Sequence, residues 1–303
     1  MSVPHSISAA NAVLGGSKST LNTRRLIALQ LSEWLKTQGV SLEKIQNASS
    51  EQIKAYLLHR QAGDPEKGVK PLGMGSLKNV QSVLNKVVNA FRPATHPRRD
   101  AIREVELGQR SRRGTKRPPT DQEYAEAIQK AIAMGEQGFV LMLKLERLLG
   151  LRGQEALCCI PAFKRYLAMH CVQENASIYV GIVDGTKGGR ARSVEIIAGR
   201  KNETWEVVNQ AVSYAKENNG YLVRGKKPGL KFARSRYQYL CRKIGLVGEI
   251  SGHALRYGYA IEKLTELKEL GMTRKEASQW VARSLGHGAS RDRYVRLVYG
   301  QPR

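Results

Sequence analysis

The chain has 303 residues, a length that suits about two domains. Its 50 Lys and Arg residues outnumber 26 Asp and Glu residues, which gives a formal net charge of +24 and an isoelectric point near 10.1. An excess of this size predicts a polyanionic partner, and no apolar run approaches the ~18 residues of a membrane-spanning helix. We therefore expect a cytoplasmic protein that binds nucleic acid and does not enter a membrane.

The first third of the chain reads as a small helical domain. Residues 1–17 are mostly small and are expected to form a flexible N-terminus. Apolar periodicity then predicts helices over residues 20–39, 50–60 and 76–91, with Pro93 stopping the last one. We place an all-helical DNA-binding domain over residues 18–105.

Basic residues crowd the segment that follows, and apolar periodicity is lost there. We expect residues 106–118 to be a basic linker that lies on a phosphate backbone, with a merely solvated connection as the alternative. The residues expected to contact DNA in and near this segment are Arg98, Arg99, Arg110, Arg112, Arg113, Lys116 and Arg117.

A second domain is predicted over residues 119–303. It opens with the capping-box pattern Thr120-Asp-Gln-Glu123, and a later apolar helix ends at Gly150. Two β-rich runs, 178–183 and 192–197, flank a glycine-rich turn and predict a hairpin. Helices are expected over residues 203–218, 230–244, 252–270 and 273–285, with a short one from Ser290. The predicted fold class is therefore mainly α with a small β-hairpin.

Cofactor motifs are missing from the sequence. The four cysteines form no C-x-x-C pair, so we expect reduced thiols packed in a core and no zinc site. No phosphate-binding glycine loop of the nucleotide or dinucleotide type is present. We expect neither a metal nor a cofactor.

A set of polar residues stands in fitting contexts along the second domain. An arginine follows a buried helix with a carboxylate three residues on, a lysine lies in the hairpin turn, and an imidazole and a guanidinium share a helix that starts after Ser251. A second histidine ends a later helix, and two tyrosines lie in the last one. The residues are Arg152, Glu155, Lys187, His253, Arg256, His287, Tyr294 and Tyr299.

These side chains suit attack on a phosphodiester. Two arginines can hold the non-bridging oxygens and offset the charge of the transition state. A tyrosine can form a covalent phosphoprotein intermediate, while an imidazole takes its proton and a lysine protonates the leaving oxygen.

The motifs resemble those of the tyrosine recombinase (phage integrase) family. Leu149-Gly-Leu-Arg-Gly-Gln-Glu155 is similar to the first arginine block of that family, and the run Thr186–Ile196 to its hairpin lysine block. His253-Ala-Leu-Arg256 and Leu285-Gly-His287 are similar to its H-x-L-R and second histidine blocks. The resemblance covers roughly residues 20–300. It implies a two-domain architecture, a helical core-binding domain followed by a mixed α/β catalytic domain.

The resemblance also implies roles for the residues. Arg152 and Arg256 would clamp the scissile phosphate, with Glu155 orienting its neighbours. Lys187 would be the general acid, His253 would assist proton transfer, and His287 would hydrogen-bond the phosphate. Arg190 and Arg192 in the lysine block are further expected DNA contacts.

The position of the nucleophile departs from the family pattern. The family tyrosine usually lies nine residues after the second histidine, and Arg296 holds that position here. The local Arg293-Tyr294 pair favours Tyr294, whereas a longer loop would favour Tyr299. Tyr294 is the preferred prediction, and Tyr299 is the alternative.

The resulting expectation is a site-specific DNA recombinase that works through a 3′-phosphotyrosyl intermediate, for integration or excision of a bacterial mobile element. The resemblance implies core sites in double-stranded DNA as the partner and a tetramer on two duplexes. It also implies a bacterial cytoplasmic protein that is nucleoid-associated when bound. The alternatives are a catalytically degenerate DNA-binding accessory protein and an activity like that of type IB topoisomerases.

Overall fold

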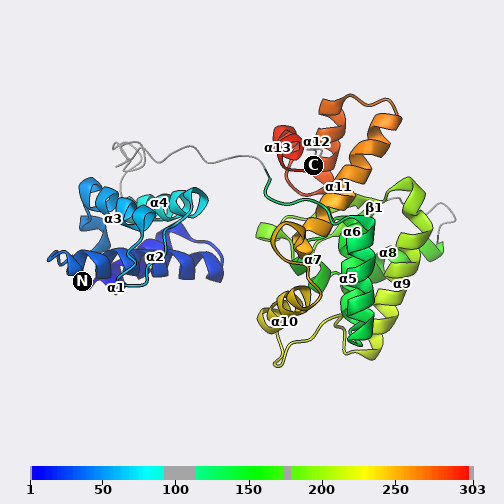
Figure 1. The fold of residues 1–303 in the computed structure, drawn as a ribbon, viewed down its shortest axis with the longest axis horizontal. Coiled ribbons are helices and arrows are strands. Elements are labelled where there is room, and N and C mark those ends of the chain that lie inside the picture. The colour runs from blue at the N-terminus through cyan, green and yellow to red at the C-terminus, as the bar shows by residue number, and fades with distance from the viewer. Residues whose placement is uncertain (1, 92–113, 173–178, 300–303) are drawn as a thin grey trace. The chain divides into compact units, whose positions relative to one another are not determined.

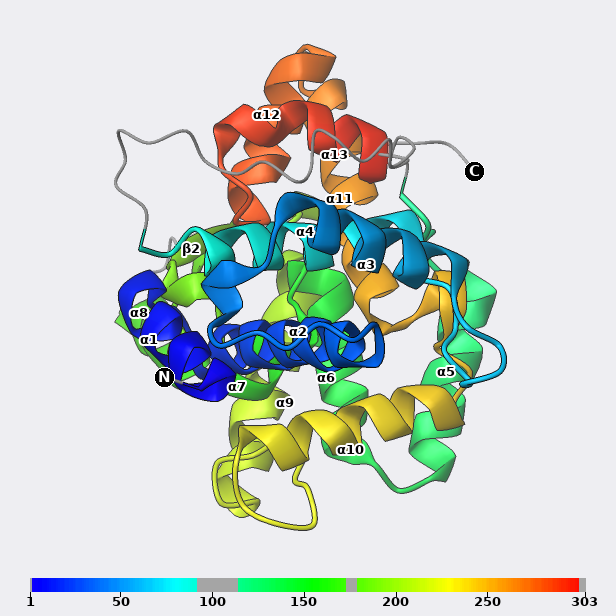
Figure 2. The same cartoon turned by 90° about the vertical axis from the view of Figure 1, so that its left-hand side faces the viewer.

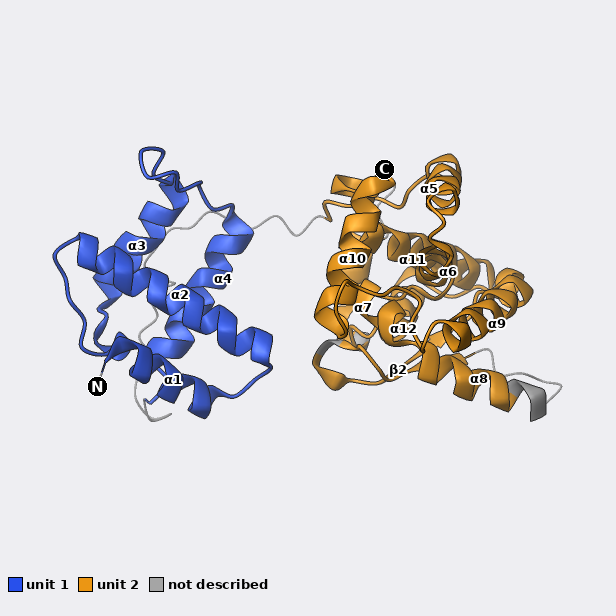
Figure 3. Ribbon diagram, turned by 90° about the horizontal axis from the view of Figure 1, so that it is seen from below, with its two compact units in different colours: residues 1–111 blue, residues 112–303 orange. Residues whose placement is uncertain are grey.

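The computed structural model describes residues 2–91, 114–172 and 179–299, without the side chains of residues 170–172, 187 and 289 (Figure 1). The chain divides into two compact units, residues 1–111 and 112–303 (Figure 3). Helices dominate both units and the described sheet has two strands, which confirms the predicted fold class. No helix in the described residues is long and apolar enough to cross a membrane.

Unit 1 is a helical bundle with its own hydrophobic core. Its helices are α1 (Val3–Leu14), α2 (Lys18–Thr37), α3 (Ser50–Ala62) and α4 (Met74–Val88), with a short 3-10 turn η1 (Ile45–Asn47). Each helix turns an apolar face inward, and Leu31, Leu57 and Leu84 are completely buried where these faces meet.

The prediction of a flexible N-terminus over residues 1–17 was wrong for α1. Pro4 fits the first turn of this helix, where no backbone hydrogen bond is lost. Val3, Ile7 and Ala10 recur at helical spacing and are buried against α2 and α4. Packing of this apolar stripe stabilises a segment whose small residues alone suggested no structure.

Unit 2 holds most of the predicted site. Its helices are α5 (Asp121–Ala133), α6 (Gln137–Leu149), α7 (Gly153–Cys158), α8 (Ile160–Val172), α9 (Lys201–Glu217), α10 (Leu230–Lys243), α11 (Gly252–Glu269), α12 (Arg274–Ser284) and α13 (Asp292–Val298). Single 3-10 turns are η2 (Lys187–Gly189), η3 (Ala198–Arg200), η4 (Gly248–Ile250) and η5 (Ala289–Arg291). The helix α6 is almost entirely buried and packs against α9 and α11. Figures 1 and 2 show α12 and α13 at one end of this unit and α10 at the other.

The sheet is the predicted hairpin. Strands β1 (Tyr179–Ile182) and β2 (Arg192–Glu195) pair antiparallel, with Ile182 opposite Arg192 and Tyr179 opposite Glu195. Side chains alternate between faces, so Arg192 shares the buried face with Val194. The connecting turn contains the backbone of Lys187 in η2.

The start of unit 2 lies against elements that carry site residues. The amide of Gly114 donates to Leu297 O of α13 at 3.4 Å, and a side chain at Gly114 would come within 2.7 Å of Val298 O. Lys116 Nζ donates to Ser251 Oγ at 2.5 Å and to Gly248 O at 3.0 Å. Ser251 is the N-cap residue of α11, as predicted, but its side chain does not cap the helix.

Candidate active site

The first arginine block lies at a sharp turn between two helices. Gly150 ends α6 with φ +55°, and a side chain there would overlap the ring of Tyr259 at 2.6 Å. Arg152 then precedes α7, and its backbone amide donates to Glu155 Oε2 at 2.8 Å. Its guanidinium donates to Glu155 Oε1 at 2.5 Å and to Leu285 O at 3.2 Å. The turn therefore brings Arg152 toward the residues just before His287.

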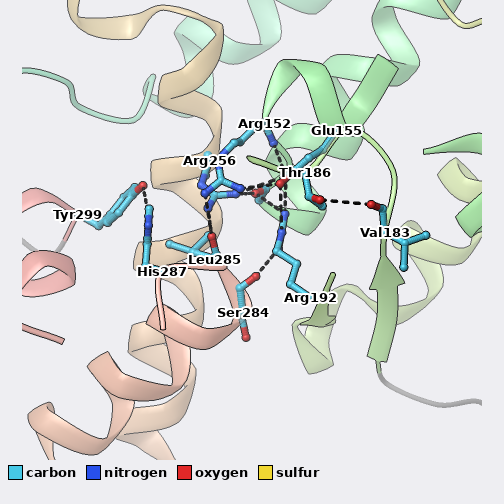
Figure 4. A network of polar contacts seen from close by, with 11 residues as sticks. Arg152, Glu155, Val183, Thr186, Arg192, Arg256, Ser284, Leu285, His287 and Tyr299 are labelled. Atoms are coloured by element: carbon cyan, nitrogen blue, oxygen red, sulfur yellow. Dashed lines mark hydrogen bonds and ion pairs between the residues drawn. The ribbon is translucent and has the colours of Figure 1, made fainter. Parts of the chain in front are cut away.

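Arg256 lies in the same cluster (Figure 4), and its side chain is completely buried. Its two terminal nitrogens donate to Gly150 O and Leu285 O, and Nε has no hydrogen-bond partner among the residues that the structure describes. Burial, together with the charges of Arg192 and Arg152, lowers the pKa of Arg256 to about 10, so the group stays cationic at neutral pH. A cation with an unsatisfied N–H group is suited to an anionic ligand.

One carboxylate balances this concentration of positive charge. Glu155 is fully buried and lies 2.7 Å from Arg192 and 3.7 Å from Arg256, in addition to its bond with Arg152. Burial alone would raise the pKa of Glu155. The charge and hydrogen bond of Arg192, the Arg152 amide and the charge of Arg256 outweigh burial and bring it to about 2. Glu155 is therefore ionised at neutral pH and holds the arginines together.

Both predicted histidines are neutral at neutral pH. Burial and the charges of Arg256 and Arg152 lower the pKa of His287 to about 3. The same causes, with the charge of Lys116, lower the pKa of His253 to about 4, although its exposure lets water screen part of the effect. A neutral imidazole can accept a proton, which is what a general base requires.

The two tyrosines lie differently around His287. Tyr299 is only 2% exposed, and its hydroxyl lies 3.1 Å from His287 Nε2 (Figure 4). Its ring packs on Tyr257 at 4.4 Å between centroids. Tyr294 is 39% exposed and meets the edge of the His287 ring at 5.1 Å. A cavity of about 550 Å³ lies beside Tyr299 and is lined by Tyr257 and Lys116 among others.

Arg192 is not the DNA contact that the sequence suggested. Its side chain is 3% exposed and donates to Glu155 Oε2 at 2.7 Å, to Gly150 O at 3.3 Å and to Ser284 O. Strand alternation explains the error, because the first residue of β2 must point to the buried face that Val194 also occupies. Arg190, in the turn before it, is exposed and remains a candidate contact.

Most of the other predicted DNA contacts cannot be located, and two of them make contacts within the protein. Arg98, Arg99, Arg110, Arg112 and Arg113 lie outside the described residues, as does the side chain of Lys187. Arg117 makes two hydrogen bonds of 2.6 Å to Glu123, and Lys116 is bonded to Ser251 and Gly248. These two side chains fasten the start of unit 2.

Sequence reasoning missed a basic surface on α10 and the loop before it. Residues 224–243 hold eight Lys and Arg residues and no Asp or Glu, which was the available signal. The exposed cations are Arg224, Lys226, Lys227, Lys231, Arg234, Arg242 and Lys243. Arg236 and Lys243 also lie over the ring of Tyr239, at 5.3 and 5.6 Å from its centroid. This helix packs against α7, next to the arginine block.

Comparison with solved structures finds one recurrent architecture. The chain is similar to a lambda integrase tetramer bound to a Holliday junction, with a TM-score of 0.56 and 15% identity over 95% of this chain and 76% of that one. It is similar to the Tn1549 transposon integrase in complex with transposon right end DNA, with a TM-score of 0.56 and 14% identity over 98% and 95%. It is also similar to the XerH site-specific recombinase bound to its difH substrate, with a TM-score of 0.53 and 16% identity over 90% and 76%.

Those likenesses define the class: the fold is that of the tyrosine recombinases. A family profile described as "Integrase" matches residues 106–262, just over half of the 303 residues. The chain belongs to this integrase family, which confirms the resemblance drawn from the motifs. Comparison with curated protein sequences finds no significant match.

Proposed function

We propose that this protein cuts and rejoins duplex DNA at specific core sites through a 3′-phosphotyrosyl intermediate, and that it integrates or excises a mobile element. The observation that carries this proposal is that Arg152 and Arg256 share the Glu155 carboxylate and Leu285 O, two residues before His287, whose Nε2 lies 3.1 Å from the Tyr299 hydroxyl. Family membership makes the protein a tyrosine-type site-specific recombinase. The mobile element, the bacterial cytoplasm and a tetramer on two duplexes belong to the proposal.

The clamp in this proposal consists of Arg152 and Arg256. Their guanidiniums hold the two non-bridging oxygens of the scissile phosphate and stabilise the charge of the pentacoordinate transition state. Arg256 is completely buried, so the phosphate reaches it only after a covering side chain moves. The cavity beside Tyr299 supplies room for that movement.

The nucleophile in this proposal is Tyr299, which reverses the preference for Tyr294 drawn from the local motif. The hydroxyl of Tyr299 is within hydrogen-bond reach of His287 Nε2, and its ring is fixed by Tyr257. The neutral His287 is able to accept the phenolic proton. Tyr294 is more exposed, and we assign it a packing role against the His287 ring.

The remaining groups manage protons and the duplex. Lys187 protonates the 5′-oxygen as it leaves, and His253 assists that transfer. Glu155 keeps the two clamp arginines in position. The exposed cations of α10, together with Arg190, contact phosphates along the DNA. Energy is conserved in the phosphotyrosyl ester, so rejoining the strand needs no nucleotide.

Covalent trapping tests the proposal. A duplex that binds the protein is selected from a random pool and nicked near the crossover point, so that the cleaved strand diffuses away. We expect a protein–DNA species that survives denaturation, and a peptide map that locates the phosphate on Tyr299. Tyr299→Phe should abolish this species, whereas Tyr294→Phe should keep cleavage within about tenfold of the wild type, because it removes no reacting group.

The outcomes separate the competing functions. Phosphate found on Tyr294 would overturn the nucleophile assignment alone. Binding without any covalent species would favour a degenerate accessory protein. Relaxation of supercoiled plasmids that lack the selected site, with no strand exchange, would favour an activity like that of type IB topoisomerases.

A further inference from the structure

Arg192 is the most interconnected arginine of the site, although it is hidden from solvent. It begins β2, and its guanidinium contacts the Glu155 carboxylate and the carbonyls of Gly150 and Ser284. Those partners belong to α7, to the end of α6 and to the end of α12. One side chain therefore ties the hairpin to the segments that present Arg152 and His287.

The hairpin has a second contact with α7, the helix that carries Glu155. Gly185 lies in its turn with φ +71°, and a side chain there would come within 2.6 Å of Gln154 O in α7. The turn thus lies directly on the arginine block. Arg192 closes the base of this loop, opposite Ile182, and the backbone of Lys187 lies between the two anchors.

We propose that Arg192 is a positioning residue that fixes the lysine-bearing turn against the phosphate clamp, and not a DNA-contacting residue. The inference rests on the proposed function, in which Lys187 is the general acid. In this inference Arg192 acts through the place at which it holds the hairpin and Glu155.

The geometry explains why arginine is needed at this position. A planar guanidinium presents five N–H donors in a fixed fork, and here the fork reaches one carboxylate and two carbonyls at once. A lysine has a single nitrogen at the end of a flexible stem and cannot reach all three sites. Arg192→Lys therefore keeps the charge but loses the anchor.

A substrate with sulfur at the leaving position separates positioning of the acid from other defects. In cleavage, the Tyr299 oxygen bonds to phosphorus, the bond from phosphorus to the 5′-oxygen breaks, and that oxygen takes a proton from Lys187. A bridging 5′-sulfur leaves as a thiolate without a proton, since thiols have a pKa of about 8.5. A defect in the general acid is therefore rescued by sulfur, whereas a defect in the clamp is not.

The experiment compares single-turnover cleavage of the oxygen and sulfur substrates in the full-length protein. We expect Lys187→Ala and Arg192→Lys each to lose on the order of 10²-fold with oxygen, and to recover to within about tenfold of the wild type with sulfur. Arg256→Ala should stay impaired with both substrates. Ser193→Ala, the exposed neighbour on β2, should cleave the oxygen substrate within about threefold of the wild type, because its side chain lies on the opposite face of the strand from Arg192.

A second variant guards against a failure of Arg192→Lys to fold. Gly185→Ala disturbs the other anchor of the turn and should show the same rescue by sulfur. Wild-type cleavage by Arg192→Lys, or a loss that sulfur does not rescue while it rescues Lys187→Ala, would overturn this inference alone. A Lys187→Ala protein that sulfur does not rescue would overturn the general-acid assignment, and the inference with it.

Discussion

Glu155 is the residue on which the order of the site most depends. It is buried with no exposed surface, and its two oxygens meet three guanidiniums. A buried ion cluster of this kind is sensitive to the loss of one partner, because the remaining charges are left uncompensated. The carboxylate therefore matters for folding as well as for alignment of the clamp.

Replacing Glu155 by Gln should reveal this dependence. The variant keeps the shape of the side chain but leaves three arginines without their counter-charge, so we expect a loss of roughly 3–5 kcal/mol in the free energy of unfolding. Urea denaturation at pH 7 measures it. Glu262→Gln, at a more exposed pair of arginine contacts, is the control and should cost about 1 kcal/mol or less. Equal losses in the two variants would contradict the special place of Glu155.

His287 makes stability depend on pH in a definite direction. Its pKa falls from 6.5 to about 3 in the folded protein, so the unfolded chain binds a proton at a pH where the folded chain does not. The stabilising effect is complete above pH 6.5 and is lost as pH falls from 6.5 towards 3. Partial exposure reduces its size, and we expect a contribution of roughly 1–3 kcal/mol.

Unfolding curves at intervals between pH 7 and pH 4 test this expectation. The His287→Asn variant cannot titrate there and should lose less stability than the wild type over the same range. Glu155 cannot mimic the effect at the upper end, because its ordinary pKa of 4.5 and its folded pKa of about 2 place its contribution at lower pH. If the stability of the two proteins falls equally with pH above pH 5, the pKa of His287 is not lowered in the folded protein, and the expectation is wrong.

At the scale of elements, α10 and α11 pack closely because α11 begins with a glycine that leaves room for a side chain of α10. Gly252, the first residue of α11, faces the ring of Tyr237 on α10, and a side chain there would lie 2.3 Å from the Tyr237 hydroxyl and 3.1 Å from Cys241 Sγ. Tyr237 cannot retreat freely, because its hydroxyl is bonded to the buried Glu146 at 2.8 Å. The close approach fixes the start of the helix that carries His253 and Arg256.

Gly252→Ala should therefore push the two helices apart. We expect a destabilisation of roughly 1–3 kcal/mol and a fall in cleavage rate, since overpacking forces the backbone to shift. Thermal unfolding and the trapping assay measure the two effects. Gly181→Ala is the matched control, because no atom of the described part of the chain lies within 4 Å of the added carbon. If Gly252→Ala is as stable as this control, α10 and α11 can move apart without a loss in the free energy of unfolding.

The sequence predicted most elements because their signals are local. The capping box at Thr120 and Glu123 forms as expected, and the alternating runs became β1 and β2. The helix α1 was missed because Val3, Ile7 and Ala10 form a narrow stripe that gains stability only when α2 and α4 cover it. Tertiary packing of that kind leaves a weak trace in the local sequence.

The candidate site was predictable in its members but not in their directions. Arg152, Arg256 and His287 stand in recognisable motifs, and the structure brings them together. The choice between Tyr294 and Tyr299 depends on the orientation that the turn η5 gives to α13. That orientation cannot be predicted from the spacing of residues in the sequence. For Arg192, strand alternation with Val194 did carry the answer, and the abundance of positive charge around it concealed that pattern.

At the scale of the whole molecule, charge dominates. The net charge of +24 predicts DNA affinity that falls steeply with salt, with a slope of roughly −0.9 for each phosphate neutralised. The exposed cations of α10 are not balanced by acidic residues within residues 224–243, so they are well suited to this role.

Neutralising α10 should change the salt dependence. We expect Lys231→Gln with Arg234→Gln to weaken binding on all sequences and to reduce the slope of log affinity against log salt by about 2, because each substitution removes one cation that neutralises a phosphate. Fluorescence anisotropy over a salt series measures this slope. Arg165→Gln on α8 is the control, since this exposed arginine lies near Asp184 at 4.0 Å. An equal change in slope for each charge removed in the control would mean that net charge, and not the position of the cations on α10, determines the salt dependence of DNA binding.

The sharing of acceptors in the arginine cluster sets a rule for interpreting its mutants. Gly150 O receives both Arg192 and Arg256, Leu285 O receives both Arg152 and Arg256, and one carboxylate serves the whole group. Deleting any member frees partners that the survivors can take up, so single deletions do not report separate contributions. The sum of the losses in unfolding free energy of the three single arginine variants should differ from the loss in the triple variant. That difference measures how far the cluster behaves as one unit.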